Sequence, residues 1–153
     1  MKIICIGRNY RAHIAELDHT DQVPEAPQFF LKPDTALLRN NDPFYVPDFS
    51  KQVDYETELV VRINRVGKYI DRRFAPRYYS EVGLGIDFTA RDLQRNFIEK
   101  GLPWELSKGF DGSAVLGEFR SVEGYDINNI DFSLTVDDST VQSANTSEML
   151  FKV

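Results

Sequence analysis

The sequence predicts a single α+β domain in which strands outnumber helices, and three observations support this fold class. The chain has 153 residues, a length that suits one domain and is short for two. The clearest regular segment, Tyr55–Ile63, alternates between two faces as a strand does. The predicted strands follow one another without regular helical crossovers, which favours a mostly β arrangement over a doubly wound sheet.

The elements of the first half are assigned from apolar spacing and turn signals. Ile3–Ile6 is short, apolar and β-branched, which predicts a buried strand. Tyr10–Asp18 has helical spacing and follows Asn9, a candidate N-cap. Two prolines place a loop at Thr20–Gln28. Phe44–Val46 lies between a turn signal and a proline and is a candidate short strand.

The elements of the second half continue this pattern. Asp71–Tyr79 is a candidate short helix, and Val82–Phe88 is an apolar strand whose glycines indicate close packing. Thr89–Glu99 is a candidate helix that stops before a glycine. Lys108–Gly117 is rich in glycine, which predicts a loop. Residues 130–142 form two alternating segments around a pair of aspartates, which predicts a hairpin.

Composition limits the class of partner. The chain has 18 Lys and Arg against 24 Asp and Glu, a formal net charge of −6, which argues against a nucleic acid or an anionic membrane as its main partner. A single cysteine, Cys5, allows neither an internal disulfide nor a multi-cysteine zinc site, and we expect it to be buried and inert. No apolar stretch reaches the about 20 residues of a membrane span, so we expect a cytoplasmic protein.

Acidic residues form the first candidate site. Asp54, Glu56 and Glu58 share one face of the predicted strand, because residues two apart point the same way. Such close carboxylates repel unless they face water or share a cation, and Mg²⁺, Mn²⁺ and Ca²⁺ all prefer oxygen ligands. Asp87 ends an apolar strand and supplies either a further metal oxygen or a cap for the next helix. The alternative for the acidic row is a solvent-facing edge strand with arginines nearby.

A histidine and a glutamate form the second candidate. His13 and Glu16 are three apart on the predicted first helix and are therefore neighbours. Such a pair can activate water, because the carboxylate orients the imidazole and tunes its basicity. The alternative is an ordinary surface pair, which is common and weak.

Three further polar residues are candidates for binding an anionic substrate. Lys108 precedes a glycine, so flexible backbone would let an anion approach its ammonium group. Arg91 and Gln94 are three apart and either face the same site or form an ordinary helix face. For Lys108 the alternative is a solvated loop lysine.

Six stretches, spread over nearly the whole chain, carry a combined signal that none has alone. They are Gly7–Glu16, Pro27–Pro33, Asp54–Leu59, Gly85–Gln94, Pro103–Asp111 and Asn145–Met149. In this order they resemble the fumarylacetoacetate hydrolase family, in particular its small single-domain, acylpyruvase-like branch.

The resemblance implies a fold, a cofactor and an assembly. The family fold is a mixed β-roll of packed sheets, and its members are usually homodimers that act on small molecules, among them products of aromatic catabolism. Glu56, Glu58 and Asp87 match the three carboxylate metal ligands, generally for Mg²⁺ or Mn²⁺, with Ca²⁺ also compatible.

The resemblance also implies roles for the other candidates. His13 and Glu16 match a pair on a short lid helix that positions the catalytic water. Lys108 matches the lysine that contacts the 2-oxo acid, and Arg91 and Gln94 match residues that shape that pocket.

The implied chemistry acts on small 2-oxo acids. Such an acid chelates a metal through its carboxylate and keto oxygens, and the cation stabilises the enolate that forms when a C–C bond breaks. We expect hydrolysis of an acylpyruvate-type C–C bond. The alternatives at the same site are isomerisation of a 2-hydroxyhepta-2,4-diene-1,7-dioate and decarboxylation or tautomerisation of oxaloacetate. A rival from another class is a non-catalytic ligand-binding or oligomerisation domain of the same fold.

The end of the sequence departs from the family pattern. Members of the family continue past Asn145–Met149 into further elements, including a Thr-Gly-Thr-Pro-type loop that lines the active site, and this sequence stops at Val153. We therefore expect the domain at residues 1–153 to lack its C-terminal elements. A chain that does not fold alone is the second rival.

Overall fold

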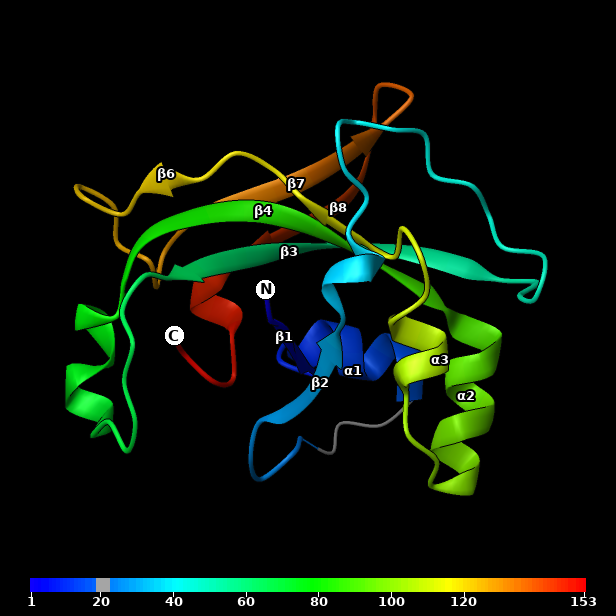
Figure 1. The fold of residues 1–153 in the computed structure, drawn as a ribbon, viewed down its shortest axis with the longest axis horizontal. Helices are drawn as coiled ribbons and strands as arrows, with labels where there is room; N and C mark the ends of the chain where they lie inside the picture. Colours follow the sequence, from blue (N-terminus) through cyan, green and yellow to red (C-terminus); the bar gives the residue numbers. More distant parts are fainter. Residues whose placement is uncertain (19–22) are drawn as a thin grey trace. The chain divides into compact units, whose positions relative to one another are not determined.

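The computed structural model describes residues 1–18 and 23–153, so part of the loop predicted at Thr20–Gln28 lies outside the described residues. It has an α+β fold that is richer in strands than in helices, as the sequence predicts (Figure 1). The strands are β1 (Ile3–Gly7), β2 (Gln28–Lys32), β3 (Val53–Ile63), β4 (Tyr79–Ala90), β5 (Ala114–Leu116), β6 (Arg120–Ser121), β7 (Asp131–Val136) and β8 (Ser139–Asn145). The helices are α1 (Arg11–Asp18), α2 (Arg91–Lys100) and α3 (Glu105–Lys108), with short 3-10 helices η1 (Asp34–Ala36), η2 (Arg72–Arg77) and η3 (Thr146–Glu148).

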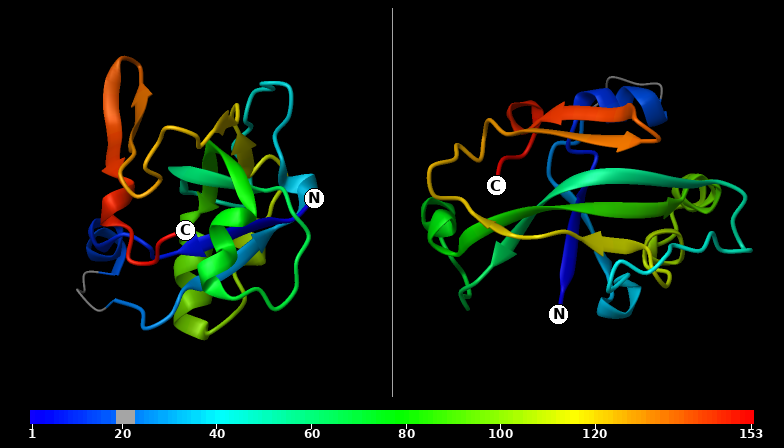
Figure 2. Two further views of the ribbon diagram at one scale, coloured as in Figure 1. Left: turned by 90° about the vertical axis from the view of Figure 1, so that its left-hand side faces the viewer. Right: turned by 90° about the horizontal axis from the view of Figure 1, so that it is seen from above.

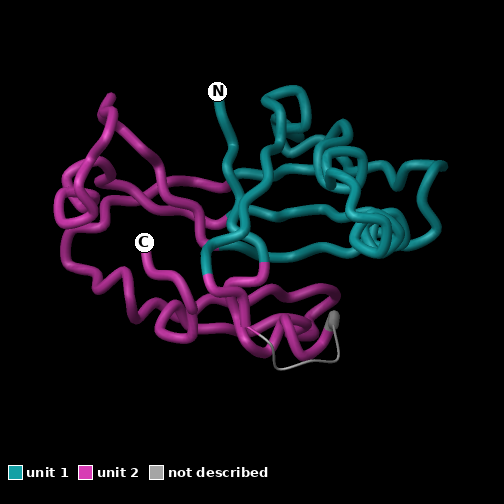
Figure 3. The backbone as a smooth tube through the Cα atoms, turned by 90° about the horizontal axis from the view of Figure 1, so that it is seen from below, with its two compact units in different colours: residues 1–7, 26–58, 85–116 teal, residues 8–25, 59–84, 117–153 magenta. Residues whose placement is uncertain are grey.

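The described chain divides into two compact units, which Figure 3 colours separately. The first unit contains residues 1–7, 26–58 and 85–116, and the second contains residues 8–25, 59–84 and 117–153. The two long strands, β3 and β4, pair side by side and contribute residues to both units (Figure 2). The carboxylates of the first candidate site all belong to the first unit.

Two sheets position the candidate site within the first unit. Strands β1 and β2 pair antiparallel, and alternation along β2 buries Phe30 and Lys32 while it leaves Phe29 exposed. In the other sheet β4 lies between β3 and β5, with Asp87 opposite Ala114. The central position of β4 therefore brings Asp87 within reach of side chains on β3.

Helix α2 follows β4 directly, and side-chain contacts fix where it begins. The carboxylate of Asp92 accepts hydrogen bonds from Ser50 Oγ at 2.6 Å and from the Lys51 backbone at 2.9 Å. At the other end Gly101 has a φ of 63°, in the left-handed region where a Cβ is unfavourable. The helix predicted at Thr89–Glu99 is therefore confirmed, with both ends shifted toward the C-terminus.

The hairpin β7–β8 is the clearest element of the second unit. Its strands pair antiparallel, and the two-residue turn consists of Asp137 and Asp138, with φ of 47° and 63°. Positive φ at both central residues matches the right-handed twist of the flanking strands, and aspartate tolerates it better than most residues. The predicted hairpin is confirmed.

Asn9 has a different role from the one predicted. Its Nδ2 donates to the Phe151 carbonyl at 3.0 Å, and its Oδ1 accepts from the Phe151 N–H at 2.7 Å. Both polar groups of the side chain thus hold the segment after η3. In the structure Asn9 therefore binds the main chain of Phe151 and does not have the predicted role of an N-cap.

Three segments differ from the sequence prediction. Phe44–Val46 is not a strand; Phe44 instead stacks on Phe88 with ring centroids 3.8 Å apart, and the two residues after it are exposed. The segment Asp71–Tyr79 holds a 3-10 helix containing a proline instead of an α-helix. The predicted loop Lys108–Gly117 contains β5 and begins at the last residue of α3, a short helix that no pattern in the sequence predicts.

Cys5 lies on β1 opposite Phe30 and is half-buried, less than the full burial expected from the sequence. Burial, assisted by the negative charge of Asp87, raises the pKa of the Cys5 thiol to about 12. Since the thiolate is the reactive form, this environment fits the expected inert cysteine.

Candidate metal centre

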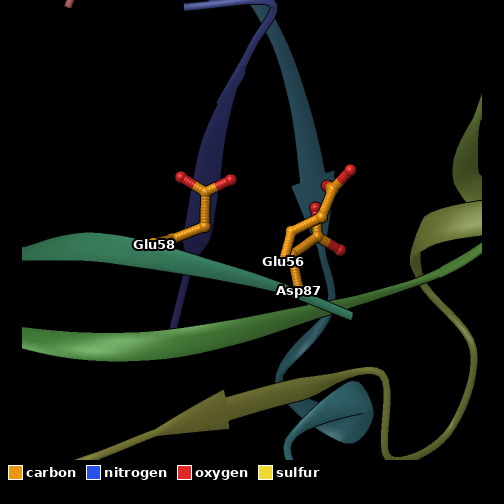
Figure 4. Close-up of side chains that lie close together, drawn as sticks. All are labelled: Glu56, Glu58 and Asp87. Carbon is orange, nitrogen blue, oxygen red and sulfur yellow. The ribbon is translucent and has the colours of Figure 1, made fainter. Parts of the chain in front are cut away.

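Glu56, Glu58 and Asp87 converge on one side of strands β3 and β4 (Figure 4). The two glutamates share this face because they are two residues apart on β3, and the pairing of β3 with β4 adds Asp87. Each residue offers one carboxylate oxygen, and these oxygens all lie within 4.8 Å of one another. Residues far apart in the sequence therefore form one acidic cluster, which we call the carboxylate cluster.

The donor set of the carboxylate cluster fits a divalent cation. Mg²⁺ binds oxygens at about 2.0–2.1 Å and Ca²⁺ at about 2.3–2.6 Å, so opposite ligands of one ion are about 4–5 Å apart. The largest separation between the three oxygens, 4.8 Å, falls within this range. An all-oxygen set without cysteine or histidine favours Mg²⁺, Mn²⁺ or Ca²⁺ over Zn²⁺ or Cu²⁺.

Lys108 is buried beside the carboxylate cluster at the end of α3. Its Nζ donates to Asp87 Oδ2 at 2.7 Å, to Thr89 Oγ1 at 2.6 Å and to Glu56 Oε2 at 3.1 Å. Burial alone would lower the pKa of Lys108, but Asp87 and Glu56 outweigh it and raise that pKa. The structure does not support the alternative of a solvated loop lysine.

Arg91 and Gln94 lie on the first turn of α2 and support the carboxylate cluster from the side. Arg91 Nε donates to Asp54 Oδ2 at 2.7 Å, and its two other nitrogens pair with Glu56 Oε1 and Gln94 Oε1. Arg91 and Gln94 are both buried. In this arrangement Arg91 fixes the position of Glu56, and two residues of the acidic row of β3, Asp54 and Glu56, are paired with cationic side chains.

Glu58 differs from its neighbours in having no ion pair within the described part of the chain. The surrounding chain removes part of its hydration and, together with the negative charges of Asp87 and Glu56, raises the pKa of Glu58 to about 8. The side chain keeps an exposed surface, so water offsets part of the first cause. A cation at the carboxylate cluster would relieve the repulsion that remains.

Lys32 also belongs to this site, although its position in the sequence predicts no role for it. It is 2% exposed, and its Nζ pairs with Asp87 Oδ1 at 2.7 Å. Burial is the main cause that lowers the pKa of Lys32, against the opposing effect of Asp87. One signal was available in the sequence: Lys32 is two residues from Phe30 on an apolar strand and therefore shares its buried face.

Asp87 does not cap the helix that follows it. It lies inside β4, and Ala90, the residue at the N-cap of α2, makes no side-chain capping bond. Asp87 is 5% exposed, and its carboxylate pairs with Lys32 and Lys108. Of the two alternatives for Asp87, the structure contradicts the helix cap, and the metal ligand stays a prediction.

His13 and Glu16 lie on α1, in the second unit. His13 is half-buried and Glu16 is exposed. Their spacing on the helix is the one expected of a neighbouring pair. Their approach to the carboxylate cluster, which belongs to the first unit, stays a prediction.

Comparison with known proteins identifies relatives along the whole chain. The family model described as fumarylacetoacetate (FAA) hydrolase C-terminal matches residues 2–153. The mitochondrial oxaloacetate decarboxylase of Dictyostelium discoideum is 37% identical over 99% of this chain and 70% of that protein. The mitochondrial oxaloacetate tautomerase of Bos taurus is 34% identical over 99% of this chain and 68% of that protein.

Solved structures have the same fold. A fumarylacetoacetate hydrolase family protein of Yersinia pestis CO92 has a TM-score of 0.90 and 36% identity, over 97% of this chain and 68% of that one. The fumarylpyruvate hydrolase of Pseudomonas aeruginosa, solved in complex with Mn²⁺ and pyruvate, has a TM-score of 0.89 and 31% identity over 99% of this chain and 67% of that one. The α+β, mostly β fold predicted by resemblance is therefore confirmed, and the chain belongs to the fumarylacetoacetate hydrolase family.

Proposed function

We propose that this chain is a divalent-metal-dependent enzyme that acts on small 2-oxo acids. The observation that carries the proposal is the carboxylate cluster: three oxygens within 4.8 Å on one face, beside the buried ammonium of Lys108. The primary reaction is hydrolysis of an acylpyruvate-type C–C bond. Tautomerisation or decarboxylation of oxaloacetate is the second candidate, favoured by the names of two sequence relatives.

We assign Glu56, Glu58 and Asp87 as the ligands of Mg²⁺ or Mn²⁺. The Pseudomonas aeruginosa relative contains Mn²⁺, which supports this choice of metal. Such an ion, when bound, polarises the keto and carboxylate oxygens of a 2-oxo acid and stabilises negative charge that develops on them. Arg91 donates to Glu56 Oε1, which keeps this ligand oxygen in position before the ion arrives.

Lys108 has the properties required to bind the acid end of the substrate. Its raised pKa keeps the Nζ protonated at neutral pH, and it lies at 2.7 Å from one proposed ligand and 3.1 Å from another. A carboxylate placed at the cluster would therefore meet a fixed positive charge. Gln94, which pairs with Arg91, would shape the same pocket.

We assign proton transfer to His13 and Glu16. An imidazole nitrogen of His13 would accept a proton from the attacking water during hydrolysis, while Glu16 holds the ring in orientation. Tautomerisation needs only the movement of a proton between carbon and oxygen, so the two reactions place different demands on this pair. His13→Ala should therefore lower the rate of acylpyruvate hydrolysis by a larger factor than the rate of oxaloacetate tautomerisation or decarboxylation.

The proposal is tested by adding metal and substrate to the purified chain. Mn²⁺ at about 100 times its dissociation constant stabilises a native-state site by about 2.7 kcal/mol, so the thermal midpoint should rise. Acetylpyruvate and oxaloacetate turnover should then depend on Mn²⁺ and fall at least 100-fold in Lys108→Met. An unchanged midpoint contradicts the metal site, whereas a raised midpoint without turnover of either acid favours the non-catalytic domain of the same fold.

We also propose a homodimer, from the family resemblance, and a cytoplasmic location, from the sequence expectation stated above. Light scattering after size-exclusion chromatography tests the assembly, because a monomer of 17.6 kDa and its dimer separate clearly. Among the described residues, no helix has the length and apolar character needed to span a membrane.

A further inference from the structure

We propose that Lys32 is a positioning residue of the metal centre. Its ammonium group links Oδ1 of Asp87 to fixed main-chain carbonyls. The other oxygen, Oδ2, then faces Glu56 and is the one that we assign to the cation. This inference rests on the proposed function, since the role has a consequence only where the carboxylate cluster binds a cation. It adds a residue to the site that neither its sequence pattern nor the family resemblance assigned.

The contacts of Lys32 leave it no hydrogen for a substrate. Its Nζ donates to Asp87 Oδ1 at 2.7 Å, to the Ser113 carbonyl at 2.8 Å and to the Phe88 carbonyl at 3.1 Å, and it also contacts the Lys108 carbonyl. An ammonium group has three N–H donors, so four acceptors saturate it. Three of these four acceptors belong to the main chain and cannot rotate away.

The contacts of Lys108 are of a different kind. All three of its acceptors are side-chain oxygens, and two of them belong to the proposed metal ligands Asp87 and Glu56. A cation at the carboxylate cluster would therefore compete with Lys108 for its oxygens. Lys32 shares only Oδ1 of Asp87 with the cluster and keeps its carbonyl partners in either state.

This difference predicts opposite effects on metal affinity. By charge alone, removing either ammonium group removes a repulsion and should tighten the binding of a divalent cation. If Lys32 positions Asp87, its loss instead leaves Oδ1 with only the 3.4 Å hydrogen bond from Thr89, so the carboxylate is held less firmly and binding weakens. Losing a residue that orients a metal ligand typically costs about 10–100-fold in affinity. The sign of the change therefore separates positioning from simple electrostatics.

The experiment compares Mn²⁺ dissociation constants of the full chain and three lysine-to-methionine variants, by titration calorimetry and electron paramagnetic resonance. Lys32→Met should bind Mn²⁺ at least tenfold more weakly than the parent. Lys108→Met should bind it as tightly or more tightly. Lys100→Met is the matched control, because Lys100 is an exposed lysine at the end of α2, and it should stay within twofold.

A second readout separates positioning from damage to the fold. At saturating Mn²⁺, Lys32→Met should recover turnover to within about threefold of the parent, measured with whichever of acetylpyruvate and oxaloacetate the parent turns over, because occupancy restores the site. Lys108→Met should not recover. A Lys32→Met chain that binds Mn²⁺ as tightly as the parent, or that stays inactive when saturated, overturns the proposal.

A second variant and an NMR measurement on the parent keep the proposal testable if Lys32→Met does not fold. Lys32→Gln, which retains N–H donors without the charge, should fall between the parent and Lys32→Met in Mn²⁺ affinity. In the parent, the ammonium NMR signal of Lys32 should persist when Mg²⁺ is added, and its loss would overturn the proposal. A parent that binds no divalent cation contradicts the proposed function itself, and it does so before any variant is measured.

Discussion

Glu56 and Asp87 each pair with two cations, whereas Glu58 has none in the described part of the chain. Loss of hydration and the charges of its two acidic neighbours raise the pKa of Glu58 to about 8. The metal-free chain therefore contains one carboxylate whose ionised form is unfavourable. Binding a cation would stabilise the ionised form of this residue. A neutral replacement should therefore stabilise the metal-free chain and, at the same time, remove its response to metal.

Glu58→Gln should stabilise the metal-free chain and destroy its response to metal. The replacement puts a neutral amide of nearly the same shape in place of the carboxylate, so we expect the thermal midpoint without metal to rise by about 1–4 °C, the shift that roughly 0.5–1 kcal/mol produces at this chain length. The rise that Mn²⁺ causes in the parent should be lost. Thermal unfolding with and without Mn²⁺ measures both effects, and Glu118→Gln, at an exposed glutamate, should change neither.

The same variant has a defined pH dependence. Because folding raises the pKa of Glu58, the folded chain binds this proton more tightly than the unfolded chain, and stability from this group falls as pH rises. The advantage of Glu58→Gln should therefore be absent below pH 4.5, grow with pH and level off above about 8. An advantage that shrinks as pH rises would contradict the assigned repulsion.

Strand alternation was enough to place Glu56 and Glu58 on one face, since a period of two needs no knowledge of tertiary structure. It could not place Asp87 beside them, because strand pairing joins residues far apart in the sequence, and that match came from family resemblance. Lys32 was missed for a related reason. A lysine that ends an apolar run is usually solvated, and its buried carbonyl partners come from segments that only the fold brings together.

At the level of elements, the start of α2 determines where Arg91 lies and hence how Glu56 is held. Asp92 ties this start to the segment before β3, through Ser50 and Lys51. The hydrogen bond from Ser50, followed by that from Lys51, holds the pKa of Asp92 below its ordinary value. The ionised form of Asp92 is therefore the one that stabilises the fold.

Asp92→Ala should lower the free energy of unfolding by roughly 1–2 kcal/mol, the scale of hydrogen bonds to a charged acceptor that is partly exposed. A group with a lowered pKa gives its stability above its unfolded pKa and loses it as pH falls through the folded pKa. The difference between parent and variant should thus disappear in acid. Urea unfolding at several pH values measures it, with Glu99→Ala, an exposed acid near the other end of α2, as the matched control.

Elements with a strong local pattern were predicted well, and those that depend on distant contacts were not. The hairpin and β3 follow from alternation and turn residues, which are local properties. Helix α3 covers only Glu105–Lys108, a length at which periodicity carries no signal. The apolar character of Phe44 predicts a strand, but in the structure its ring stacks on Phe88 instead.

For the molecule as a whole, the two compact units share the strands β3 and β4. Because each of these strands runs without a break through both units, loss of its hydrogen bonds in one unit removes support from the adjoining residues in the other. We therefore expect the chain to unfold in one cooperative transition, although its contacts cluster into two groups. The metal centre allows a direct test, because its proposed ligands all lie in the first unit.

Binding of Mn²⁺ should move the entire unfolding transition and not only the part that reports on the first unit. Fluorescence of Trp104, the single tryptophan, follows the first unit, while far-ultraviolet circular dichroism follows the strands of both. At about 100 times the dissociation constant of Mn²⁺, both midpoints should rise together by about 5–10 °C. If the fluorescence transition moves and a second phase of the dichroism stays in place, the units unfold independently and the shared strands do not couple them. Glu58→Gln, measured in parallel, should keep the two midpoints coincident while removing the shift, because it changes the ligand set and leaves both strands intact.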